Sequence, residues 1–144
     1  MPILDQAAKL ATNKMPKVIS PKAHAIIDYA MAASFFGMAA FFWKRNKRAA
    51  VGALVCGTAE TITALCTDYP GGVMDKISYE THGTIDFGLS GMVASLPDML
   101  RFKDEPESRF FRIQGIAKAA VAGLTDFTGS GEGGQMEKLD RRSA

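Results

Sequence analysis

Four apolar segments separated by short polar stretches dominate the pattern of this chain. They run over about residues 23–43, 49–69, 81–100 and 110–127. Each is long enough for a helix, and the polar stretches between them are short enough to connect antiparallel neighbours. Pro70, Gly71 and Gly72 end the second segment. The pattern predicts an all-α fold, an antiparallel four-helix bundle.

The first segment is apolar on every face, which is typical of a fully buried helix or of a helix in lipid. It carries no charge from Tyr29 to Trp43, and its length suits the hydrocarbon core of a bilayer. Lys44, Arg45, Lys47 and Arg48 follow Trp43, as expected for an interfacial anchor. We therefore expect a transmembrane bundle with the lipid bilayer as partner. A soluble bundle with an unusually apolar first helix is the alternative.

The sequence also matches itself when it is shifted by 58 residues. Among the identical pairs are Ser20/Ser78, His24/His82, Asp28/Asp86, Gly57/Gly115, Thr67/Thr125 and Asp68/Asp126. An internal repeat constrains architecture before any single motif does. We expect two tandem helical hairpins, residues 23–70 and 81–128, related by a pseudo-twofold axis and joined by a linker at 71–80. A polar, amphipathic segment (1–22) precedes them and a flexible polar tail (129–144) follows.

Charge and composition narrow the classes of partner and the location. A net charge of +2, without a basic stripe interleaved with aromatic residues, argues against nucleic acid. Residues 1–22 contain no apolar core of a cleavable signal peptide. The compact basic loop at 44–48 favours the cytoplasmic side of an inner (cytoplasmic) membrane for that loop. A homo-oligomer is compatible with a duplicated chain.

The repeat brings six polar residues to one end of the predicted bundle. Each histidine begins a helix of its hairpin, and an aspartate follows four residues later, one turn deeper on the same face. Further aspartates end the second and fourth helices. Imidazole and carboxylate together suit zinc, manganese or ferrous iron, and bundles build metal sites from facing helices. The predicted ligands are His24, Asp28, Asp68, His82, Asp86 and Asp126.

Three other interpretations of this cluster stand beside a divalent metal or small polar ligand. Haem could use His24 and His82 as axial ligands, although the aspartates would crowd negative charge against the porphyrin. Ionisable groups within a membrane could instead form a proton or ion path, as in a small proton-coupled carrier. The groups could also only fasten helices in a structural or subunit-type membrane protein without a cofactor.

The repeat is broken at one charged position. Glu60 of the first half corresponds to Lys118 of the second, and each lies eight residues before its helix-end aspartate. Eight residues place each of these side chains about two turns from the end of its helix, inside the predicted bundle. A single charge there would be costly, whereas two facing opposite charges neutralise each other. We predict a buried Glu60–Lys118 ion pair. No Ser-His-Asp or Cys-His nucleophile pattern is convincing, so the sequence leans away from an enzyme without deciding the question.

Overall fold

The computed structural model describes residues 2–3, 6 and 15–128. Within them, four long helices follow one another: α2 (Pro21–Phe42), α3 (Lys47–Cys66), α4 (Tyr79–Met99) and α5 (Ser108–Leu124). The predicted all-helical fold is confirmed. The helices α3 and α5 end three residues earlier than the apolar pattern predicts. The predicted tail at 129–144 and half of the predicted amphipathic segment (1–22) lie outside the described residues.

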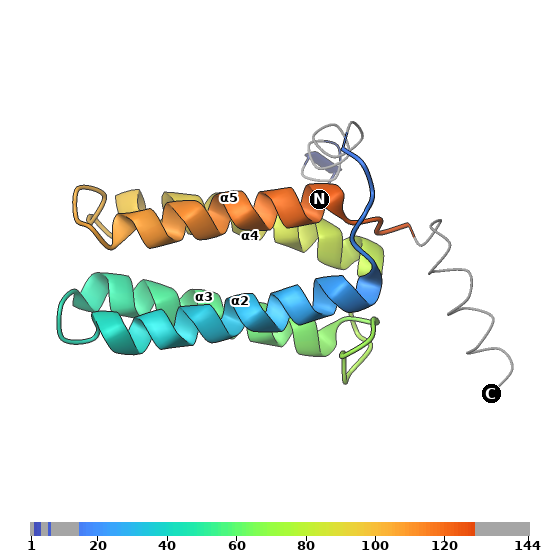
Figure 1. Ribbon diagram of the computed structural model, residues 1–144, viewed down its shortest axis with the longest axis horizontal. Helices are drawn as coiled ribbons and strands as arrows, with labels where there is room; N and C mark the ends of the chain where they lie inside the picture. The colour runs from blue at the N-terminus through green and yellow to red at the C-terminus, as the bar shows by residue number, and fades with distance from the viewer. Residues whose placement is uncertain (1, 4–5, 7–14, 129–144) are drawn as a thin grey trace, which may run out of the picture.

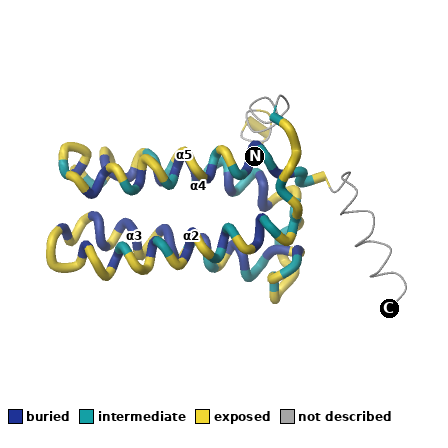
Figure 2. Tube along the Cα trace, viewed as in Figure 1, coloured by how far each residue is buried: buried dark blue, intermediate teal, exposed yellow. Residues whose placement is uncertain are grey.

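The helices pack as two hairpins, α2 with α3 and α4 with α5. Figure 1 shows them as two layers, with the turns that follow α2 and α4 at one end of the molecule and the connection from α3 to α4 at the other. The turns after α2 and α4 are largely exposed, as the yellow segments of Figure 2 show. We call the end with these two turns the basic end, and the end with residues 67–78 the histidine end.

Local sequence signals explain where the helices begin. Ser20 and Ser78 cap α2 and α4, since the two hydroxyls accept hydrogen bonds from Ala23 N and Thr81 N, both at 3.2 Å. Both serines, which the 58-residue shift pairs, are therefore the N-cap residues of their helices. Asn46 does the same for α3, accepting from Ala49 N at 3.1 Å. Such side chains satisfy backbone donors that have no partner within the helix.

Two parallel β-bridges close the histidine end. Ile19, before α2, pairs with Thr125 after α5, and Ile77, before α4, pairs with Thr67 after α3. Both threonines are extended, with φ/ψ of −97°/137° at Thr125 and −87°/138° at Thr67. The chain therefore stops being helical at the same point of each hairpin. Ile19 and Ile77, like Thr67 and Thr125, differ by 58 residues.

The interior of the bundle is divided along its length. Toward the basic end it is an apolar core that draws on all four helices and is rich in phenylalanine; Phe35, Phe42, Phe102 and Phe111 are each at most 3% exposed. Toward the histidine end the interior is polar. The charged residues in the central part of the helices are Asp28, Glu60, Asp86 and Lys118, and all four are buried.

The outer surface of the helices is correspondingly apolar. Exposed side chains on it include Ile26, Phe36, Val51, Leu54, Val55, Ile62, Ile113 and Ile116. The helices α2 and α3 are long and apolar enough to cross a membrane, a test that the core helices of soluble proteins also pass. At about 1.5 Å per residue, the 22 residues of α2 span about 33 Å.

Candidate metal centre

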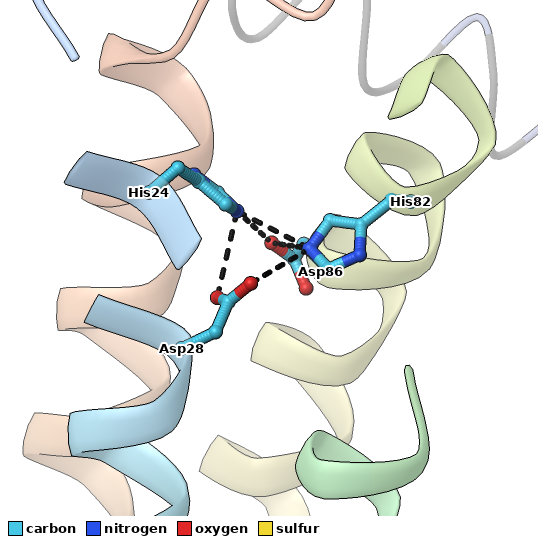
Figure 3. Close-up of side chains that lie close together, drawn as sticks. All are labelled: His24, Asp28, His82 and Asp86. Carbon is cyan, nitrogen blue, oxygen red and sulfur yellow. Dashed lines mark hydrogen bonds and ion pairs between the residues drawn. The ribbon is translucent and has the colours of Figure 1, made fainter. Parts of the chain in front are cut away.

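Four side chains converge between α2 and α4 at the histidine end (Figure 3). They are His24, Asp28, His82 and Asp86, and each is at most 1% exposed. Each helix contributes one histidine and, four residues later, one aspartate. This spacing places both side chains of a pair on the same helix face, as predicted. We call these four residues the His/Asp cluster.

The ligand atoms of the cluster lie close enough together to surround one ion. His24 Nε2 is 3.2 Å from His82 Nε2 and 3.0 Å from Asp86 Oδ2. His82 Nε2 is 3.1 Å from Asp28 Oδ2 and 3.1 Å from Asp86 Oδ2, and His24 Nε2 is 3.5 Å from Asp28 Oδ1. Ligands about 2.1 Å from one first-row metal ion stand about 3–3.5 Å from each other. The group could therefore hold a metal ion.

Two threonines determine which nitrogen of each histidine carries the proton. Thr67 Oγ1 donates its own hydrogen to Thr63 O at 2.6 Å and lies 2.7 Å from His82 Nδ1. With its hydrogen used, the hydroxyl accepts from that nitrogen, so neutral His82 has the proton on Nδ1 and a lone pair on Nε2.

The other histidine is arranged in the same way. Thr125 Oγ1 donates to Val121 O at 2.7 Å and lies 2.9 Å from His24 Nδ1. Both Nε2 atoms therefore direct lone pairs at each other and at two carboxylates. When both imidazoles are neutral, these four lone-pair donors repel one another, and either a proton on an imidazole or a metal ion between them relieves the repulsion. Histidine ligands of metals are held by an outer hydrogen bond of this kind.

Aromatic rings surround the histidines. The centroid of the His24 ring lies 5.1 Å from that of Phe127 and 5.9 Å from that of Tyr79, and the His82 centroid is 5.2 Å from that of Tyr69. Tyr69 also donates from its hydroxyl to Asp28 Oδ2 at 2.8 Å. Burial and the neighbouring Asp28 carboxylate raise the pKa of Tyr69, so it remains a neutral donor.

A tight turn places Tyr69 and Thr67. Gly71 has φ of +110°, a conformation that suits glycine, and a side chain at Gly72 would collide with the carbonyl oxygen of Thr67. Gly72 N donates to Tyr69 O at 2.9 Å and closes the turn. The two glycines thus allow the chain to turn sharply after α3.

Two predicted ligands lie elsewhere. Asp68 is exposed, and Asp126 accepts hydrogen bonds from the backbone nitrogen and the hydroxyl of Thr128. The prediction assumed that α3 and α5 continue to these residues. Because the chain is already extended at Thr67 and Thr125, successive side chains alternate in direction. The threonines contact the histidines, and the group of close ligand atoms does not include the two aspartates that follow them.

Glu60 and Lys118 are brought together, as the sequence predicts. Lys118 Nζ lies 2.9 Å from Glu60 Oε2, joining α5 of one hairpin to α3 of the other. The prediction treated this pair as separate from the cluster, but Lys118 Nζ is also 2.7 Å from Asp86 Oδ1. A lysine side chain is long enough to reach back one turn, so the ion pair and the cluster form one network.

The geometry also bears on the haem alternative. The two Nε2 atoms are neighbours at 3.2 Å with both carboxylates beside them, which leaves no room for a porphyrin between the rings.

Comparisons with family models, curated proteins and solved structures found no match for this chain.

Proposed function

We propose that this protein is a small integral membrane protein that binds one divalent transition-metal ion, zinc, manganese or ferrous iron, in the His/Asp cluster. The observation that carries the proposal is the convergence of two buried imidazoles and two buried carboxylates, with the imidazoles held by Thr67 and Thr125. Two imidazoles with two carboxylates suit these ions better than they suit calcium or magnesium, which prefer oxygen ligands alone.

The distribution of charge supports the membrane part of the proposal. In a soluble bundle charged residues cover the outside, whereas here the four charges of the central helix region are buried and apolar side chains face outward. Buried ionisable groups of membrane helices typically pair with one another inside the bundle. The basic loops after α2 and α4 would then lie in the cytoplasm, and the histidine end on the opposite side.

The repeat supports a pseudo-twofold arrangement of the proposed site. The contacts of His24 with Thr125 and of His82 with Thr67 interchange under the 58-residue shift, as do the two β-bridges. A duplicated hairpin whose copies pack face to face explains this pairing. The metal would lie close to the axis, with one histidine and one aspartate from each copy.

The metal proposal is tested by elemental analysis of protein purified in detergent without chelators, and again after loading with each ion and desalting. We expect one ion per chain in the wild type and less than about a tenth of that in Asp28→Asn and Asp86→Asn. Asp98→Asn is the matched control, because Asp98 is an exposed aspartate of α4 outside the cluster. A wild-type chain that retains none of the three ions would refute the proposal and leave helix fastening as the role of the cluster.

Membrane insertion and orientation have their own tests. We expect the protein to stay with membranes through alkaline carbonate washing; recovery in the supernatant would refute insertion. Orientation is tested in a chain whose Cys56 and Cys66 are replaced by alanine, in intact cells whose outer barrier lets a membrane-impermeant maleimide through. The maleimide should label the Asp75→Cys variant but not the Lys44→Cys variant. The reverse labelling would invert the proposed orientation.

A further inference from the structure

The side chain of Lys118 lies between two carboxylates inside the bundle. Its Nζ is 2.7 Å from Asp86 Oδ1 and 2.9 Å from Glu60 Oε2, and the side chain is 2% exposed. Three helices supply these groups, α4, α5 and α3. An ammonium held at these distances by two carboxylates is a charge-assisted pair that is fully removed from water.

The Asp86 carboxylate connects the lysine to the cluster. Its Oδ2 faces the two histidines at 3.0 and 3.1 Å, while its Oδ1 faces the ammonium. Carboxylates in two-metal centres bridge two cations in this manner, one at each oxygen. Here the ammonium occupies the place of the second cation, so the network has room for one metal ion.

The formal charges of the network define the charge of that ion. Asp28, Glu60 and Asp86 contribute three negative charges and Lys118 one positive charge, while the histidines are neutral ligands. With both histidines neutral, as metal ligands must be, the network carries a net charge of −2, and one divalent ion neutralises it. Uncompensated charge inside a bundle is costly, so a neutral loaded state is the stable one.

We infer that Glu60 and Lys118 are specificity-determining residues that adjust the cluster to a single doubly charged ion. Lys118 acts as a fixed cation that excludes a second metal, and Glu60 offsets its charge. Neither residue contacts the two histidines in the manner of Asp28 or Asp86. This inference rests on the proposed metal function and extends it to the charge of the ligand and its stoichiometry.

Glu60→Gln tests the inference, because the amide has the shape of the carboxylate and its oxygen still accepts from Lys118. The substitution removes one negative charge that the contacts through Lys118 place within about 10 Å of the ion. Against a doubly charged ion at about 10 Å, with an effective dielectric constant of 20, this weakens binding by at least about 100-fold. The dissociation constants for Zn²⁺ and Mn²⁺ are measured in detergent by competition with a chromophoric chelator, and both should rise by a similar factor.

The double variant Glu60→Gln/Lys118→Gln restores the net charge of −2. We expect its Kd to return to within about fivefold of the wild-type value, a rescue that a purely structural role of the ion pair would not produce. Thr63→Val, a neutral change one turn away on α3, is the matched control and should leave Kd unchanged. Lys118→Gln alone makes the network more negative and should tighten metal binding. This variant still tests the inference if the Glu60→Gln protein cannot be purified in folded form.

The outcomes separate this inference from the proposed function. If the wild type binds no metal, the proposed function fails. If the wild type binds one ion but Glu60→Gln binds equally well, or the double variant remains as weak as Glu60→Gln, the metal site stands and the charge-setting role is wrong. Two ions per wild-type chain would also overturn the inference.

Discussion

Replacement of Thr125 by valine probes the most specific feature of the proposed centre, the hydroxyl that fixes His24. Valine has nearly the same shape but accepts no hydrogen bond, so Nδ1–H of His24 would be left buried without its 2.9 Å partner. An unsatisfied buried donor costs about 1–3 kcal/mol. The ring can avoid this cost by moving its proton to Nε2, but that nitrogen then has no lone pair for a metal.

The expected loss of metal affinity follows from the same bond. Removing an outer hydrogen bond from a histidine ligand typically weakens metal binding about 10–100-fold, which corresponds to about 1.4–2.7 kcal/mol. The two ranges agree. Thr67→Val should behave alike through His82, whose Nδ1 is 2.7 Å from the hydroxyl of Thr67. The pair of variants thus tests both halves of the centre.

The assay is a competition titration of detergent-purified protein against a zinc-binding dye. Thr125→Ser and Thr67→Ser are the controls, because serine keeps the hydroxyl and should retain affinity within about threefold. Valine variants that bind as tightly as the wild type would refute the assigned tautomers. Serine variants as weak as the valine variants would show that the methyl group, not the hydroxyl, is what the site needs.

Three further predictions concern the surroundings of the centre. Tyr69→Phe removes the hydrogen bond to Asp28 and should weaken zinc binding several-fold in the same titration, since one such bond contributes about 1 kcal/mol. An unchanged Kd would mean that this hydrogen bond does not help Asp28 to bind the metal. Gly83→Ala places a methyl group 2.6 Å from the ring of Phe127 and should destabilise the fold by about 1–3 kcal/mol, seen as a lower Tm. Gly88→Ala, with no atom within 4 Å, is its control and should raise or preserve the Tm. Removing the metal with a chelator should lower the Tm. Adding zinc at 100 times Kd should restore about 2.7 kcal/mol of unfolding free energy. A Tm that does not change with zinc would contradict binding of zinc to the folded state alone.

Much of the centre could be predicted because it follows from two regular periods. The 58-residue repeat pairs His24 with His82 and Asp28 with Asp86, and the helical period puts each aspartate one turn below its histidine. Alternating helix directions then place both pairs at one end of the bundle. None of these steps depends on knowing how side chains pack.

The errors and omissions arise where the regular period ends. Asp68 and Asp126 were predicted as ligands because a helix continued to them would carry them to the same end. The change to extended backbone at the preceding threonines reverses which side chain points inward. Thr67 and Thr125 are identical under the repeat and could have been found by that signal, but hydroxyls are weak indicators of a site until their partners are known.

The threonine contacts also connect the two halves of the chain in a way that affects assembly. Thr125 belongs to the second hairpin but holds the histidine of the first, and Thr67 belongs to the first but holds the histidine of the second. Neither half alone contains a correctly held histidine. Two fragments expressed separately, with the break in the exposed connection after Pro70, would each fail to bind metal. They would form the proposed centre only by combining. Metal capture would therefore report that both hairpins have docked.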